Sequence, residues 1–242
     1  MAAIINELKK YSSESRKQTN LRFFKTGKGE YGEGDTFIGV TVPDCRKVAG
    51  TFLDSPLFTI EKSLQSPMHE ERLTALLILV EKYQKTNNEN EKNDLAAFYL
   101  QNKKFVNNWD LVDLSADKIL GNYLLNEKMN RKIIYELIQS PNMWDRRIGI
   151  IATFAFIRKM QFRDTFSMCE RLLSDEHDLM HKACGWMLRE IGKRDEKALE
   201  EFLKKHVHMM PRTMLRYAIE RLPEKKRKKY LNAGKERSRT GK

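Results

Sequence analysis

The sequence lacks any apolar run that approaches the roughly 20 residues needed for a membrane-spanning helix. Its most apolar stretch, Leu73 to Val80, is eight residues long and has charged neighbours on both sides. The N-terminal segment also lacks the basic start, long apolar core and small-residue cleavage site of a secretory signal. These absences predict an intracellular, cytoplasmic protein that has no membrane partner.

Cysteine is scarce, and its arrangement excludes two kinds of site. The three cysteines, at positions 45, 169 and 184, are odd in number and widely spaced, which fits neither a disulfide framework nor a zinc ribbon. His177 and His181 are four residues apart, but no Glu follows His177 as in the zincin motif, and no third ligand is suitably spaced. Solvated or capping histidines are the better interpretation, so we expect no metal and no other cofactor.

Glycine is concentrated in one segment, with four glycines between Gly27 and Gly34. This density disfavours regular structure and predicts a loop. A glycine-rich loop can cradle a phosphate, but no predicted strand precedes this one and no Gly-Lys-Ser/Thr follows it. The sequence therefore argues against a nucleotide-binding loop. No sustained strand-like alternation occurs elsewhere.

Positive charge is abundant. The 242 residues carry a net charge of +12, and the isoelectric point is near 9.5. Glu224 to Lys242 contains nine Lys or Arg and two Glu, so this tail contributes +7 and leaves +5 for the rest of the chain. A basic tail can be a solubilising or localising appendage. The smaller excess on the body is compatible with a polyanionic partner such as nucleic acid.

Two segments near the N-terminus have helical patterns. Residues 2–19 predict one short amphipathic helix, with Ile4 and Leu8 on its apolar side. A second helix is predicted from about Pro43 to Phe52. Thr41 is its expected N-cap, and a proline in the first helical turn loses no hydrogen bond.

A repeated pattern occupies most of the remaining chain. An apolar helix end, a serine-containing turn and a helix of small and large apolar residues recur at residues 64–79, 138–152 and 172–188. Equivalent positions in these copies, in the 109–113 segment and in a weaker last copy are 34 or 35 residues apart: Asp113, Arg147, Lys182 and Arg216. Two helices per unit at such a period are typical of a helical solenoid. We predict an all-α fold, a HEAT-like α-α superhelix of stacked helical hairpins, with one domain over residues 1–222 and a basic tail over 223–242.

Trp109 and Asp113 form the first candidate site. Asn107 and Asn108 can cap a helix start, after which the tryptophan and the aspartate lie one turn apart on the same face. An aromatic face beside a carboxylate suits a flat cationic ligand. Taken alone, however, such a pair is more often a core aromatic and a solvated acid.

The repeat places this pair in a series of similar positions. A solenoid aligns equivalent residues along its concave surface. Here the aligned helices carry Trp109 and Asp113, Trp144 and Arg147, Lys182 and Trp186, and Arg212 and Arg216. Cations with interspersed tryptophans suit a phosphate backbone. Because aromatics and arginines also mark protein interfaces, a protein-binding solenoid stays open as an alternative.

Five motifs resemble a known family: Gly-Glu-Tyr-Gly-Glu-Gly-Asp at 29–35, Phe-Ile-Gly-Val-x-Val-Pro-x-x-Arg at 37–46, Trp-Asp-x-Val-Asp at 109–113, Trp-x-x-Arg at 144–147 and Gly-Trp-x-Leu-Arg-Glu at 185–190. In this order and spacing the sequence resembles the AlkD-like DNA glycosylases, bacterial DNA alkylation repair proteins of HEAT-like fold. The resemblance covers roughly residues 20–220. It implies a base excision repair enzyme that removes positively charged alkylpurines, such as 3-methyladenine and 7-methylguanine, from double-stranded DNA without fully flipping the lesion. A monomer is the default expectation for this kind of superhelix.

The resemblance also implies roles for individual residues. Trp109 and Trp186 correspond to tryptophans that contact the deoxyribose and backbone at the lesion, Asp113 to the catalytic carboxylate, and Arg147 to an arginine at the neighbouring phosphate. Phe23 falls near an active-site aromatic that is often tyrosine, so the hydroxyl is absent here. Lys182, Arg212 and Arg216 are further DNA-binding candidates from the repeat. A non-catalytic DNA-binding HEAT-like protein and a protein-interaction scaffold are the alternatives.

Overall fold

The computed structural model describes residues 3–126 and 129–234, and all of the regular structure in these ranges is helical. The only extended pairing there is an isolated parallel bridge between Thr36 and Met68. The predicted all-α, HEAT-like fold class is therefore confirmed. None of the described helices combines the length and the apolar character needed to cross a membrane.

The chain divides into two compact units, Met1–Tyr123 and Leu124–Lys242. The prediction of one domain over residues 1–222 with a tail over 223–242 stays a prediction. Residues 224–233 of that tail form a helix, whereas residues 235–242 lie outside the described part of the chain.

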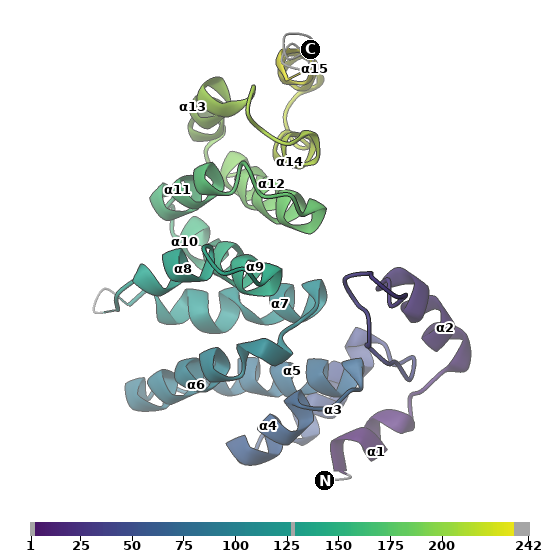
Figure 1. Cartoon of the computed structure of the whole chain (residues 1–242). Helices are drawn as coiled ribbons and strands as arrows, with labels where there is room; N and C mark the ends of the chain where they lie inside the picture. The colour runs from purple at the N-terminus through teal and green to yellow at the C-terminus, as the bar shows by residue number, and fades with distance from the viewer. Residues whose placement is uncertain (1–2, 127–128, 235–242) are drawn as a thin grey trace. The chain divides into compact units, whose positions relative to one another are not determined.

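Unit 1 is organised around one long buried helix. In chain order its elements are α1 (Ala3–Lys9), α2 (Glu14–Phe23), α3 (Val42–Thr51), α4 (Leu57–Leu64), α5 (His69–Lys85), α6 (Glu89–Gln101), the 3-10 turn η1 (Lys103–Phe105), α7 (Trp109–Ser115) and the π-helical turn η2 (Asp117–Gly121). Helix α5 packs against α3, α4 and α7 (Figure 1). Its residues from Leu73 to Val80 are all buried, so the most apolar stretch of the sequence forms the core of this unit.

The single helix predicted over residues 2–19 is wrong. The chain turns after α1, and Ser13 takes an extended conformation in which its N–H donates to the carbonyl of Ile38 at 3.1 Å. Gly39 lies so close to this turn that a Cβ on it would stand 2.1 Å from the carbonyl oxygen of Ser13. The break therefore depends on a contact with a distant segment, which the local helical pattern does not reveal.

Two other N-terminal predictions are confirmed. Helix α3 starts close to the predicted residue, and the N–H of Asp44 donates to the hydroxyl of its N-cap Thr41 at 3.3 Å. The glycine-rich segment is a loop. Two of its backbone N–H groups, those of Gly27 and Gly29, donate to the Glu30 and Glu33 carboxylates at 2.9 and 2.7 Å. Acidic side chains thus occupy donors that a phosphate-binding loop would present to its ligand.

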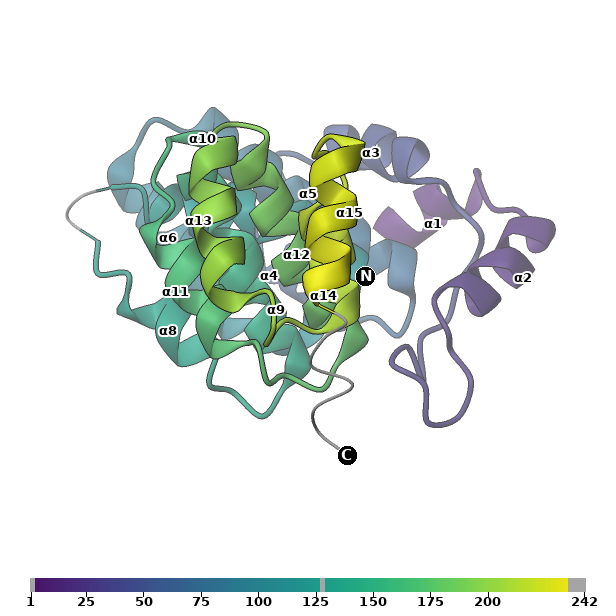
Figure 2. The ribbon, with the colours of Figure 1, turned by 90° about the horizontal axis from the view of Figure 1, so that it is seen from above.

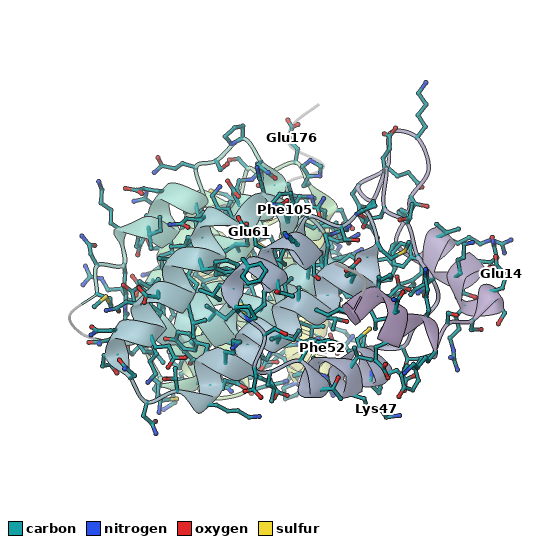
Figure 3. All side chains as sticks on the ribbon, turned by 90° about the horizontal axis from the view of Figure 1, so that it is seen from below. Glu14, Lys47, Phe52, Glu61, Phe105 and Glu176 are labelled. Atoms are coloured by element: carbon teal, nitrogen blue, oxygen red, sulfur yellow. The ribbon has the colours of Figure 1, made fainter. Side chains whose placement is uncertain are left out.

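The outer surface of unit 1 carries charged side chains. Glu14 of α2 and Lys47 of α3 point away from the ribbon, and their side chains are 71% and 66% exposed (Figure 3). Substitutions at such positions are suitable controls, because they change the net charge and leave the core unchanged.

Unit 2 contains the helices from α8 onward. They are α8 (Lys132–Leu137), α9 (Met143–Ala152), α10 (Phe154–Arg158), α11 (Arg163–Arg171), α12 (Asp178–Gly192), α13 (Glu196–His206), α14 (Arg212–Ala218) and α15 (Glu224–Ala233). Helix α9 packs against α8 and α12, and α12 packs against α13 and α14.

The helix starts reproduce the predicted repeat. Helices α7, α9, α12 and α14 begin at residues 109, 143, 178 and 212, so their starts are 34, 35 and 34 residues apart. Each of the four aligned residues is therefore the fifth residue of its helix: Asp113, Arg147, Lys182 and Arg216.

The turns before three helices use the same hydrogen bonds. The side-chain oxygens of Ser66, Ser140 and Asp175 each accept from the N–H two residues later, at 3.1, 3.2 and 2.9 Å. Six residues after each of these positions, a side chain donates back to the carbonyl oxygen of the same residue: Arg72 at 3.0 Å, Arg146 at 3.0 Å and His181 at 2.5 Å. His181 thus holds a repeat turn.

Candidate active site

The start of α7 positions the first two site residues. The buried N-cap Asn108 accepts from the N–H of Trp109 at 2.8 Å, and its amide donates to Asp35 at 2.9 Å. Helix α7 then places Trp109 and Asp113 one turn apart, and both side chains are half-buried. The local geometry predicted from the asparagine cap and the four-residue spacing is confirmed.

Both residues line a pocket of about 430 Å³ that lies within unit 1. Four aromatic side chains dominate its wall: Phe23, Phe24, Phe37 and Trp109. Its charged members are Arg16, His69, Glu70, Asp110 and Asp113, and the remaining lining residues are Asn20, Val40, Thr41, Val42, Leu73 and Leu114. Of the predicted site residues, the structure therefore brings Trp109, Asp113 and Phe23 together.

An aromatic stack fixes the orientation of Trp109. Its ring stacks on Phe24 with the centroids 5.3 Å apart and the planes 13° apart. Phe24 stacks in turn on Phe37 at 5.0 Å, and Phe37 stacks on the imidazole of His69 at 4.6 Å. Phe23 meets Trp109 edge-on at 5.7 Å and is 61% exposed. One face of the tryptophan is thus covered by protein.

His69, the last ring of this stack, contacts two aspartates. Its Nε2 lies 2.8 Å from Asp110 Oδ2, and its Nδ1 lies 3.0 Å from Asp35 Oδ2. Arg72 Nη2 donates to the other oxygen of Asp35 at 2.5 Å. All four side chains are buried, with at most 8% exposure.

Electrostatics favour the charged form of this histidine. Burial alone would lower the pKa of His69, but the charge and hydrogen bond of Asp110, followed by those of Asp35, raise it to about 9. Burial likewise opposes ionisation of Asp35, yet His69, Arg72 and Asn108 hold the pKa of that carboxyl below its usual range. At neutral pH both ring nitrogens of His69 therefore donate, one to each aspartate.

Glu70, the next residue on α5, also has a structural role. One of its oxygens accepts from the N–H groups of Ile38, Gly39 and Val40 at 3.2, 2.8 and 3.2 Å. Two of the three pocket carboxylates, Glu70 and Asp110, are thus engaged in holding the loop and α7 in place. Asp113 is the half-buried member of the three, whereas Glu70 and Asp110 are buried, which makes it the stronger candidate for contact with a ligand.

The other predicted residues lie in unit 2. Arg147 is only 4% exposed and donates to the carbonyl of Leu179 at 2.6 Å, although the repeat pattern predicts an accessible cation at its position. The half-buried Trp186 contacts Phe154, with the ring centroids 5.7 Å apart. The last three predicted residues differ in surroundings: Lys182 pairs with Asp178 at 2.8 Å, Arg212 donates to the carbonyl of Leu231 at 2.8 Å, and Arg216 is exposed. That these five residues act together with Trp109 and Asp113 stays a prediction.

Comparison with known proteins gives the family. The model of the DNA alkylation repair enzymes matches residues 4–222. The chain belongs to this family.

The fold agrees with the family. A solved structure of a predicted DNA alkylation repair enzyme from Enterococcus faecalis matches with a TM-score of 0.70 and 19% sequence identity, over 88% of this chain and 97% of that one. At this identity the likeness shows a shared fold. Comparison with the curated proteins finds no significant match.

Sequence reasoning missed the buried network of this alkylation repair protein. Asp35 and Asp110 each belong to a motif of the family resemblance, at 29–35 and 109–113, but neither received a role. The structure shows that both motifs meet on His69. The sequence indicated these residues only as acids in two motifs and a histidine at a helix start. Asp35 and Asp110 are 34 and 41 residues from His69, so no local pattern predicts their contact with it.

Proposed function

We propose that this DNA alkylation repair protein is a monofunctional, AlkD-like DNA glycosylase. It hydrolyses the N-glycosidic bond of cationic alkylpurines, such as 3-methyladenine and 7-methylguanine, in duplex DNA, and thereby starts base excision repair in the bacterial cytoplasm. The observation that carries the proposal is one pocket in which the half-buried carboxylate of Asp113 lies one helical turn from the oriented ring of Trp109.

The charge of the lesion explains the absence of a strong acid from the mechanism. An alkylated purine with a formal positive charge is already a good leaving group, so the bond from its nitrogen to C1′ breaks with both electrons going to the base. Positive charge then develops on the sugar. The Asp113 carboxylate stabilises that charge and orients the water that adds to C1′ and loses a proton.

Trp109 supports the same step. Because Phe24 covers one side of its indole ring, the tryptophan is held in one orientation without help from the substrate. A fixed aromatic face attracts the cationic sugar and excludes water from it. Such contacts to the sugar do not require the base to enter a deep pocket, which is consistent with cleavage without full base flipping.

The proposal assigns DNA contacts to unit 2. Arg147 binds the phosphate beside the lesion, Trp186 contacts the deoxyribose and backbone, and Lys182, Arg212 and Arg216 bind further phosphates. Such contacts fix register without reading the base sequence. The protein acts as a monomer in this proposal.

The reaction ends at an abasic site. A lyase step requires an amine that attacks C1′. Among the described residues that line the pocket there is no lysine. This supports a hydrolase that leaves the DNA strand intact.

One assay tests the proposal. The protein is incubated with methylated duplex DNA, and the released bases and the strand products are separated. We expect 3-methyladenine and 7-methylguanine in solution and abasic sites in uncut strands. Strand cleavage in the absence of added alkali would refute the monofunctional assignment. Salt-dependent DNA binding without any base release would favour the non-catalytic alternative.

A further inference from the structure

Helix α15 is the part of the described chain that the family does not explain. It spans Glu224–Ala233, beyond the residues matched by the family model, and carries five consecutive cations from Lys225 to Lys229. Neighbouring like charges on one helix repel each other. Acidic partners within the protein, or an anion from outside, would relieve this repulsion.

One side of α15 has such partners. Lys226 Nζ lies 2.5 Å from Glu196 and 2.9 Å from Glu200 of α13, and the hydroxyl of the buried Tyr230 donates to Glu200 at 3.2 Å. From α14, Arg212 donates to the carbonyl of Leu231 at 2.8 Å. The two views of the ribbon draw α15 next to α14 (Figures 1 and 2). Helix α15 is thus held in a defined orientation within unit 2.

The rest of the surface of α15 carries one ion pair, between Glu224 and Lys228 at 2.7 Å. Three further cations there, Lys225, Arg227 and Lys229, are exposed and form no ion pair with any residue that the structure describes. Lys225 and Lys229 are one turn apart on the same side of the helix, whereas Arg227, two residues from each, lies on the opposite flank. Three cations therefore point into solvent from a rigid support.

We propose that these three exposed cations, Lys225 and Lys229 on one flank of α15 and Arg227 on the other, bind phosphates of the DNA backbone away from the damaged base. The proposal rests on DNA as the substrate of the proposed function, but not on glycosylase activity. A membrane surface fits less well. Membrane-bound amphipathic helices insert an apolar face, whereas the apolar Tyr230 of α15 is already buried in the protein.

Counterion release gives the proposal a measurable consequence. Each phosphate contact contributes about 0.9 to the slope of log K against log salt on B-form DNA. Loss of three contacts should therefore lower the magnitude of the slope by up to about 3, and weaken binding most at low salt.

The test uses the full chain and unmodified duplex DNA. The variant K225Q/R227Q/K229Q removes the three exposed cations of α15. A matched control, K197Q/K204Q/K205Q, removes three exposed lysines of α13 in the same unit and changes the net charge equally. Binding constants are measured by fluorescence anisotropy from low to high salt. A charge-retaining variant, K225R/R227K/K229R, controls for disturbance of the helix.

We expect a shallower salt slope only for the α15 glutamine variant, with wild-type behaviour for the other two. An unchanged slope in that variant, or an equal decrease in both glutamine variants, would overturn the proposal, since the second result reports net charge alone. Wild-type DNA binding with lost affinity for acidic lipid vesicles would also overturn it. Base release from methylated DNA at saturating enzyme is measured in parallel. If no protein releases base but α15 still controls binding, the glycosylase proposal fails and this one stands.

Discussion

His69 donates a hydrogen bond through Nε2 to Asp110 at 2.8 Å, and this contact connects the first residue of α5 to the residue after Trp109. Nδ1 of the same ring binds Asp35 at the end of the glycine-rich loop. One buried imidazolium thus joins the loop, the central helix of unit 1 and the helix that carries Asp113. The pocket owes its shape to this junction as well as to the aromatic stack.

Replacement of His69 by glutamine should destabilise unit 1 and alter the pocket. The neutral amide leaves Asp110 without its buried charged partner, and breaking such a pair typically costs about 3–5 kcal/mol. Urea unfolding measures the change. In the double variant H69Q/D110N both charges are gone, so part of the loss should be recovered. Strictly additive losses would show that the two side chains do not interact.

The pH dependence of stability should carry the signature of the same histidine. Its pKa rises from an ordinary 6.5 to about 9 in the folded protein, so its contribution is fully present below pH 6.5 and is lost as pH rises through 9. At about 1.4 kcal/mol per pKa unit, the loss is on the order of 3 kcal/mol. Asp35 has the opposite pH dependence. Its lowered pKa contributes stability that is lost as the pH falls below 3.8, the ordinary pKa of an aspartate. Unfolding free energies measured from pH 5 to 10 should decline at the alkaline end in the wild type and much less in H69Q.

The break between α1 and α2 should be sensitive to one methyl group. Gly39 has a φ of +79°, and a Cβ there would stand 2.1 Å from the Ser13 carbonyl, so Gly39→Ala should lower stability by at least about 1 kcal/mol. Gly50 is the matched control. It lies within α3 with no neighbouring atom near its Cβ position, so Gly50→Ala should stabilise the protein by about 0.5–1 kcal/mol. Equal melting temperatures for the two variants would contradict this account of the turn.

These cases separate what the sequence could predict from what it could not. The helix starts at 109, 143, 178 and 212 were predictable, because each repeat encodes its own turn and apolar pattern locally. The Thr41 cap was predictable for the same reason. The turn at Ser13 and the contacts of His69 were not, since they join residues that lie far apart in the sequence and leave no periodic trace.

Arg147 shows that alignment of the repeat does not predict the exposure of a side chain. Its position in the repeat was predicted correctly, as the fifth residue of α9, but its burial was not. Repeat alignment identifies which residues are equivalent, whereas exposure depends on how the neighbouring side chains and carbonyls pack. The carbonyl of Leu179, which accepts from the guanidinium, is such a neighbour.

Arg147→Ala should therefore have two separable effects. Loss of the proposed phosphate contact should weaken DNA binding and reduce the salt slope by about 0.9. Loss of the hydrogen bond from this buried, charged donor to Leu179 should lower stability by about 1–3 kcal/mol. Anisotropy titrations and urea unfolding measure the two effects independently. Reduced stability with an unchanged salt slope would assign Arg147 a purely structural role.

Asp113 is the residue that we propose as decisive for catalysis. In Asp113→Asn the amide keeps the size of the side chain but cannot stabilise the positive charge that develops on the sugar. Removal of one such electrostatic stabiliser typically lowers the rate by about 10²–10³-fold. We expect that decrease in the single-turnover release of 7-methylguanine from methylated duplex DNA.

The control for this measurement is Glu14→Gln, which makes the same change in net charge at an exposed position of unit 1 (Figure 3). It should release 7-methylguanine at the wild-type rate. Because Asp113→Asn removes a negative charge, its affinity for DNA should be retained or slightly increased, so the lost rate cannot come from weaker binding. If the asparagine variant released the base at the rate of the control, the carboxylate would have no role in the reaction, and the pocket around Trp109 would have to act by another mechanism.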